Sequence, residues 1–116
     1  MKLIEGIYVR TKDGKIGKII DINLGQEEKR YVLDSSSVYM YYKTDILKAS
    51  HNIIDLIEVG DYINGYPVYE TIEYPDNTRA IVIADDNKSI IWEESSQYIK
   101  SIVTKEQFER MKYEVK

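Results

Sequence analysis

The chain has 116 residues, of which 43% are hydrophobic and 31% charged, a composition that excludes an intrinsically disordered chain. It contains no cysteine, which excludes disulfide bonds and thiolate metal sites. The formal net charge of −4 is unevenly distributed, because residues 1–50 carry 9 basic and 7 acidic side chains, residues 51–99 carry 2 and 10, and residues 100–116 carry 5 and 3.

The N-terminal segment MKLIEGIYV contains Glu5 and no long apolar run, so we expect no signal peptide. The apolar runs elsewhere are far shorter than the roughly 20 residues that a membrane-spanning helix needs. We therefore expect a cytoplasmic protein without membrane association.

Short alternating segments joined by turn residues characterise the first half of the chain. The stretch GIYVRTKDGKIGKI, residues 6–19, predicts two strands joined by an Asp13-Gly14 turn. The second of these strands is expected to bend or bulge at Gly17. Further strands are expected over residues 30–34 and 38–43.

The strand over residues 38–43 alternates, and we expect Val38, Met40 and Tyr42 to point inward. Tyr39 and Tyr41 would then be exposed. The segments that follow, 45–49 and 53–57, are ambiguous. The second is either one helical turn capped by Asn52 or a strand.

The second half repeats the same pattern of strands and turns. Strands are expected over residues 61–64, 66–74, 79–84, 89–93 and 98–103. Thr104 and Gln107 match a capping box, which predicts a helix at about 105–111 with Phe108 and Met111 facing inward. A last strand over 113–115 is a further option.

The two halves align in the same order at a spacing of roughly 50 residues, which indicates an internal duplication. The clearest matches pair residues 5–9 with 59–63 and residues 40–43 with 90–93. The sequence therefore predicts a mainly β protein with two tandem small β-barrels packed together and one short C-terminal helix. Its expected domains are residues 1–50 and 51–116.

Two resemblances refine this prediction. The opening hairpin and the format of five short strands resemble SH3-like modules, including those of the KOW type. The segments NIIDLIEVGDYING, residues 52–65, and IKSIVTKEQFE, residues 99–109, resemble small uncharacterised proteins of phages and prophages from low-GC Gram-positive bacteria. The second resemblance implies a mobile-element setting and supplies no catalytic residues.

The sequence carries no convincing catalytic or metal-binding pattern. His51 is the single histidine, and we interpret it as a polar residue between the two repeats. Asp85-Asp86-Asn87 lacks the spacing, glycine and closing glutamate of a calcium loop. We therefore expect no enzyme activity, no cofactor and no metal.

The leading functional hypothesis is a non-enzymatic inhibitor of a host defence protein, of the anti-CRISPR type. It would occlude a basic surface, that of a nucleic-acid-guided effector, in the cytoplasm of an infected bacterial host. Its acidic, tyrosine-containing surface is assigned to the following residues: Glu70, Glu73, Asp76, Asp85, Asp86, Glu93, Glu94, Tyr39, Tyr41 and Tyr69.

The alternative hypothesis is a nucleic-acid-binding accessory protein that uses the basic first hairpin and the loop after it. The residues assigned to this function are Arg10, Lys12, Lys15, Lys18, Lys29 and Arg30. Acidic residues interleave with these cations, which weakens the alternative.

Overall fold

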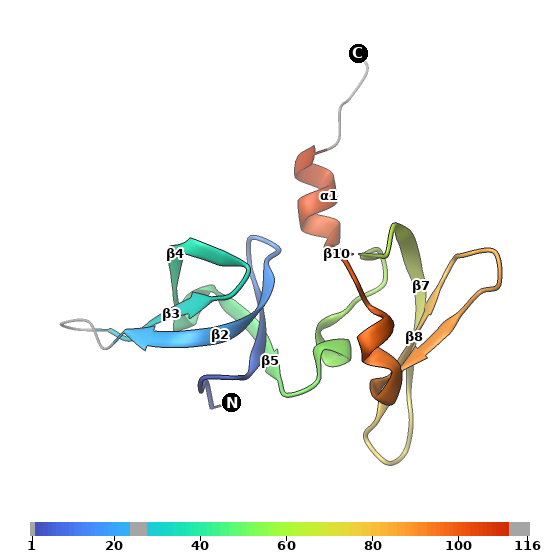
Figure 1. Cartoon of the computed structure of the whole chain (residues 1–116), viewed down its shortest axis with the longest axis horizontal. Coiled ribbons are helices and arrows are strands. Elements are labelled where there is room, and N and C mark those ends of the chain that lie inside the picture. The colour runs from blue at the N-terminus through green and yellow to red at the C-terminus, as the bar shows by residue number, and fades with distance from the viewer. Residues whose placement is uncertain (1, 24–27, 112–116) are drawn as a thin grey trace. The chain divides into compact units, whose positions relative to one another are not determined.

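A computed structural model describes residues 2–23 and 28–111, apart from the side chains of residues 36–39. The chain divides into two compact units, Met1–Leu56 and Ile57–Lys116, which we call the first and the second unit. Each unit contains one five-stranded antiparallel sheet, and one short α-helix follows the last strand (Figure 1). The predicted mainly β fold with a short C-terminal helix is confirmed at this level.

The first unit has the strand order β4-β3-β2-β1-β5. Its strands are β1 (Tyr8–Thr11), β2 (Ile16–Asn23), β3 (Arg30–Leu33), β4 (Ser36–Tyr42) and β5 (Ile46–Ser50). Two short 3-10 turns, η1 (Lys43–Asp45) and η2 (Ile53–Leu56), precede and follow β5. The ambiguous segment around residues 53–57 is thus a helical turn.

The second unit has the strand order β10-β6-β7-β8-β9. Its elements are β6 (Tyr62–Ile63), β7 (Tyr66–Glu73), β8 (Arg79–Ile83), β9 (Ile90–Trp92), the 3-10 segment η3 (Glu93–Tyr98), β10 (Ile102–Val103) and the helix α1 (Lys105–Met111). The helix occupies the predicted residues. The optional strand over 113–115 lies outside the described residues.

The two units repeat the same local geometry as well as the same strand order. Gly6 and Gly60 both have positive φ, 90° and 98°, where a side chain would be strained. The amide of Gly6 donates to the carbonyl oxygen of Ile19 at 2.8 Å, and that of Gly60 donates to Val68 at 3.0 Å. These equivalent bonds join the turn before the first strand to the second strand of each unit.

The second strand of each unit pairs with two neighbours, and its register shifts within the pairing with the third strand. In β2 the register shifts between Ile19 and Asp21, and in β7 it shifts between Val68 and Glu70. The irregularity in β2 therefore lies three residues beyond Gly17, where the bend was predicted. Gly17 instead permits a close approach, because a Cβ there would lie 2.9 Å from Asp34 Oδ1 and 3.2 Å from Leu33 Cβ.

The sequence predicted barrels, whereas the hydrogen-bonded order of both sheets is open in the described part of the chain. β4 and β5 form the edges of the first sheet, and β10 and β9 form those of the second. Edge strands present unpaired backbone groups, which proteins usually cover, shorten or guard with charge. β9 and β10 are only 3 and 2 residues long, so little backbone is left unpaired there.

The core of the first unit corrects the predicted orientation of the strand over residues 38–43. Tyr41 is only 5% exposed, whereas Met40 and Tyr42 are 45% and 38% exposed. The register places Tyr41 opposite Tyr31, which is also buried, so Tyr41 lies on the core face. The segment VYMYY has large side chains on both faces, and its alternation therefore does not reveal which face is buried.

Several residues share the first core, namely Ile7, Val9, Ile19, Tyr31, Leu33, Tyr41 and Ile46. The buried hydrophobic residues of the second unit include Ile57, Ile63, Val68, Ala80, Ile81, Val82, Ile83 and Ile91. Residues 80–83 are buried on both faces of β8, which fits a central strand flanked by β7 and β9.

The predicted capping box of α1 is confirmed, because the amide of Gln107 donates to Thr104 Oγ1 at 3.2 Å and the amide of Thr104 donates to Gln107 Oε1 at 3.1 Å. The predicted inward orientation of Phe108 and Met111 is wrong, since they are 39% and 68% exposed. Phe108 stacks on Tyr62 with ring centroids 4.8 Å apart, which covers part of its surface. Among the described residues, no helix is both long enough and apolar enough to cross a membrane.

Candidate functional site

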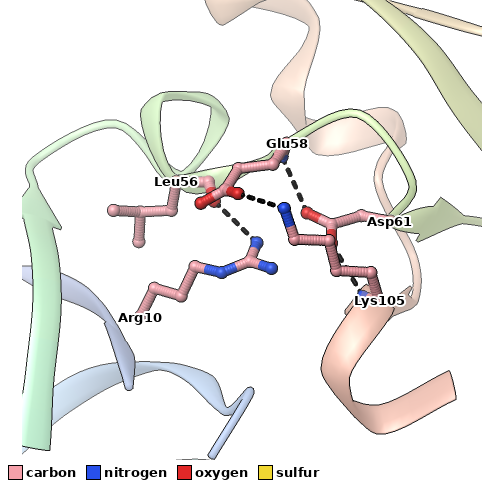
Figure 2. Close-up of polar contacts among 5 residues, drawn as sticks. All are labelled: Arg10, Leu56, Glu58, Asp61 and Lys105. Carbon is pink, nitrogen blue, oxygen red and sulfur yellow. Dashed lines mark hydrogen bonds and ion pairs between the residues drawn. The ribbon is translucent and has the colours of Figure 1, made fainter. Parts of the chain in front are cut away.

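Arg10 is a structural residue of the first unit. Its side chain is fully buried, and its Nη1 donates to the carbonyl oxygen of Leu56 at 3.0 Å (Figure 2). This bond ties the central strand β1 to η2, which contacts β1. The burial of this guanidinium is contrary to the prediction that Arg10 offers its charge to a nucleic acid.

Asp61 organises the second unit rather than contributing to an acidic surface. It is fully buried, and its two carboxylate oxygens accept hydrogen bonds from the amides of Glu58 at 2.7 Å and Lys105 at 2.9 Å (Figure 2). Lys105 Nζ also pairs with Glu58 Oε1 at 2.7 Å. Asp61 thus joins the turn before β6 to the first residue of α1, where a negative charge is favourable.

Two of the predicted partner-binding acids stabilise turns of the second unit. Asp76 accepts hydrogen bonds from the hydroxyl of Thr78 at 2.6 Å and from its amide at 3.0 Å. Asp85 accepts the equivalent pair from Ser89, at 2.6 Å and 2.8 Å. The side-chain and backbone hydrogen bonds from Thr78 and Ser89 lower the pKa of Asp76 and of Asp85 below the ordinary value of 3.8.

The lowered pKa of Asp85 predicts a measurable dependence of stability on pH. Because the pKa is lower in the folded than in the unfolded chain, the contribution of Asp85 is fully present above about pH 4 and is lost as the pH falls through the folded pKa. We therefore expect Asp85→Asn to lose less stability on acidification than the wild type. The measurement is urea unfolding at a series of acidic pH values.

Asp86→Asn provides the control for this experiment, because Asp86 is exposed and the structure shows no hydrogen bond from a described residue to its carboxylate. Its pH dependence should follow that of the wild type. An Asp85→Asn variant whose stability falls with pH as steeply as the wild type would show that the turn hydrogen bonds to Ser89 do not favour the charged carboxylate.

The remaining predicted acids are distributed over different faces of the second sheet. Glu70 lies on the same face as Ile90, because both are opposite Val82, whereas Glu73 is opposite Arg79 and faces the other side. The residues Glu70, Glu73, Asp86 and Glu94 are exposed and Glu93 is half-buried. The structure therefore does not bring all seven acids together on one surface.

The three predicted partner-binding tyrosines differ in how exposed they are. Tyr69 lies at the register shift of β7 and is 45% exposed, as expected. Tyr41 is buried, so the prediction that its ring is exposed is wrong, and its hydroxyl donates to Asp13 Oδ2 at 3.2 Å. The side chain of Tyr39 lies outside the described residues.

Trp92 is the prominent exposed residue that the sequence interpretation missed. It is 41% exposed, its cross-strand neighbour is the small residue Ala80, and its Nε1 donates to the hydroxyl of Tyr74 at 3.2 Å. Ile90, on the same face of β9, is 42% exposed. Glu93 and Glu94 follow Trp92 directly at the start of η3.

Tyr42 is the counterpart of Trp92 in the first unit. Each is the last residue of an edge strand and precedes a 3-10 segment, with φ and ψ of −85° and 160° for Tyr42 and −94° and 169° for Trp92. Tyr42 is followed by Lys43 and Trp92 by Glu93. The same position thus carries an exposed aromatic ring in both units, with neighbouring charges of opposite sign.

The predicted cations of the first unit surround its aromatic residues. Lys12, Lys29 and Arg30 are exposed, and Lys15 and Lys18 are half-buried. The guanidinium of Arg30 lies 5.4 Å from the ring centre of Tyr42, and Lys18 Nζ lies 5.4 Å from that of Tyr8.

Two open clefts of the first unit share Tyr42 as a lining residue. The first, of about 410 Å³, is lined by Glu28, Lys29, Tyr31, Tyr42, Lys43 and Thr44. The second, of about 400 Å³, is lined by Lys12, Asp13, Met40, Tyr41, Tyr42 and Asp45. Tyr42 therefore contributes to two hollows, and each of them is also lined by at least one lysine.

His51 is exposed, and within residues 2–23 and 28–111 no group of three or more acidic or histidine side chains is placed to hold a metal ion. Comparison with family models, curated proteins and solved structures finds no match to this chain.

Proposed function

We propose that this chain is a non-enzymatic binding protein whose second unit binds a basic protein surface through Trp92. The observation that carries this proposal is the exposed indole of Trp92, followed by two acidic residues at the end of an edge strand. Because Ala80 is small, the ring is not covered by its cross-strand neighbour.

The charge of the second unit supports a basic partner. Residues 57–116 contain 12 acidic and 7 basic side chains, a balance of −5, whereas residues 1–56 contain 8 and 9, a balance of +1. Complementary charge accelerates association and selects partners. A lysine or arginine of the partner that packs on Trp92 would gain a cation–π contact. Glu93 and Glu94, which follow Trp92 in the chain, would attract the same positive charge.

The apolar part of the surface supports a protein rather than a small cation as the partner. Ile90 and Trp92 project from one face of β9, and Glu70 lies on that face beyond Val82. Tryptophan and tyrosine are enriched among the residues that dominate binding energy at protein interfaces, where acidic residues usually lie at the rim.

The setting and fold make this proposal more specific. The repeated strand order, with a 3-10 segment before the last strand, supports two tandem SH3-like modules. The phage resemblance of residues 52–65 and 99–109 supports a mobile-element protein. The partner is then a host defence protein of the nucleic-acid-guided type, in the cytoplasm of an infected bacterium, and the acidic unit occupies its basic groove.

This function predicts that Trp92→Ala weakens binding to the partner by about 30-fold, the effect of losing an interface residue worth about 2 kcal/mol. The experiment screens the purified full chain against a panel of nuclease effectors for binding and inhibition, and then measures Kd for the effector that responds. Leu47→Ala changes an apolar side chain of the first unit that is 47% exposed and lines neither cleft, so this control variant should bind as the wild type does.

Two results would contradict the proposal. A chain that neither binds nor inhibits any effector in the panel would refute the defence-inhibitor function. Unchanged binding by folded Trp92→Ala would refute the assignment of the surface.

A further inference from the structure

We propose that the first unit binds single-stranded nucleic acid at Tyr42, with one base stacked on the ring and the flanking nucleotides in the two clefts beside it. This inference uses only residues of the first unit, so it goes beyond the function proposed for the second unit and does not depend on it.

The geometry around Tyr42 provides the space for such a ligand. Two clefts, of about 410 Å³ and 400 Å³, include Tyr42 in their lining. The ring is 38% exposed and already carries the Arg30 guanidinium 5.4 Å from its centre. A base that stacks on Tyr42 would extend this arrangement, in the way that proteins binding single strands use aromatic side chains.

The lysines of the clefts are available to phosphates. Lys29 and Lys43 line one cleft and Lys12 lines the other, and all three are exposed. Within the described part of the chain, none of the three forms an ion pair or a side-chain hydrogen bond. A strand that occupies both clefts would therefore meet a lysine in each of them.

Two of the three carboxylates that line the clefts are engaged by the fold. Asp13 accepts hydrogen bonds from the hydroxyls of Thr11 and Tyr41, the latter at 3.2 Å. Asp45 accepts one from the amide of Tyr42 at 2.9 Å. These donors offset part of the negative charge at Asp13 and Asp45, whereas Glu28 is exposed and opposes a phosphate at one end of the first cleft.

The aromatic ring favours a single strand over the two other polyanions that lysines attract. In a duplex the bases are already stacked on one another, so they cannot reach Tyr42 without unpairing. An acidic peptide would use the lysines but gains nothing comparable from the ring. Stacking tolerates every base, so we expect little sequence preference.

The test measures binding of fluorescein-labelled oligothymidylate to the full chain by anisotropy, across a series of salt concentrations. We expect the wild type to bind at low salt, with log K falling as log salt rises by about 0.7 for each phosphate contacted. Tyr42→Ala should weaken binding by about 5- to 100-fold, the range for loss of one stacked base, while Tyr42→Phe retains it.

The controls separate a stacking site from general attraction. Trp92→Ala, at the equivalent position of the second unit, should leave oligonucleotide binding unchanged. The double variant Lys29→Glu/Lys43→Glu should weaken it and reduce the salt dependence by about one to two phosphates. Circular dichroism of each variant shows that the exposed substitutions leave the fold intact.

Three outcomes would overturn the inference. They are absence of oligothymidylate binding by the wild type at low salt, equal binding by folded Tyr42→Ala and the wild type, and tighter binding of a duplex or of polyglutamate than of oligothymidylate. The last outcome would assign the clefts to another kind of polyanion. None of these results bears on the binding of a basic partner by the second unit.

Discussion

Replacing Asp61 with alanine is expected to lower the free energy of unfolding by about 3 kcal/mol or more. The substitution removes the acceptor for the amides of Glu58 and Lys105, at 2.7 Å and 2.9 Å, and the site is fully buried. Hydrogen bonds to a charged group stabilise more than neutral ones, and a buried donor without a partner carries its desolvation cost. Urea unfolding of the full chain measures the effect.

Lys105→Met is the matched control, because it removes the ammonium group that pairs with Glu58 and keeps the backbone amide that Asp61 binds. The two side chains are 47% and 26% exposed, so we expect a loss of about 0.5 kcal/mol. If Asp61→Ala and Lys105→Met cost the same, the carboxylate does not hold α1 against the turn before β6 as the structure indicates.

Tyr41→Ala is expected to destabilise the protein by about 3–5 kcal/mol, the usual cost of removing a large buried aromatic ring. The ring of Tyr41 is 95% buried beside Tyr31 in the core of the first unit. Tyr41→Phe keeps the ring and removes the hydroxyl that donates to Asp13 at 3.2 Å, so it should cost about 1 kcal/mol. Thermal and urea unfolding of the three proteins give the comparison.

The neighbouring residues of β4 test the orientation of the strand. Met40→Ala and Tyr42→Ala change side chains that are 45% and 38% exposed, and we expect effects within about 0.5 kcal/mol. The opposite ranking, with Met40→Ala and Tyr42→Ala severe and Tyr41→Ala mild, would restore the orientation predicted from the sequence and contradict the register of β3 and β4.

The sequence predicted the parts of the fold that depend on local chemistry. The turn residues predicted the positions of the hairpins. Thr104 and Gln107 predicted the first turn of α1, because capping needs specific side chains at a fixed spacing. The predicted correspondence of residues 40–43 with 90–93 agrees with the structure, because each segment covers the end of an edge strand and the first residue of the following 3-10 segment. The sequence did not predict the open strand order that the two sheets have in place of closed barrels.

The wrong predictions concern which face of a strand is buried and which side chains are exposed. These properties depend on the pairing partners of a strand rather than on its local sequence. Alternation in β4 shows two faces but does not identify the buried one. The pairing of Tyr41 with the buried Tyr31 places Tyr41 on the core face. Arg10 was predicted to be a surface cation, because the sequence does not show that β5 pairs with β1 and that η2 contacts it. Trp92 was missed because a single tryptophan after two isoleucines also fits a core strand.

If both proposed surfaces bind their ligands, the repeat explains how two binding surfaces arose from one module. Both units keep an exposed aromatic residue at the end of the edge strand, Tyr42 and Trp92, while the next residue differs in charge, Lys43 and Glu93. A duplicated module can change its ligand by changing the charges around a conserved platform, because complementary charge selects partners while the platform supplies the contact area. The opposite charges of Lys43 and Glu93 distinguish the two proposed surfaces.

Charge reversal at the two equivalent positions tests that opposition most directly. Lys43→Glu and Glu93→Lys are compared with the wild type for Kd toward oligothymidylate and toward polylysine, a probe for a basic protein surface. We predict that Lys43→Glu weakens only oligothymidylate binding and that Glu93→Lys weakens only polylysine binding. If either variant changes both affinities equally, or if neither changes any, the two units do not bind ligands of opposite charge through these positions.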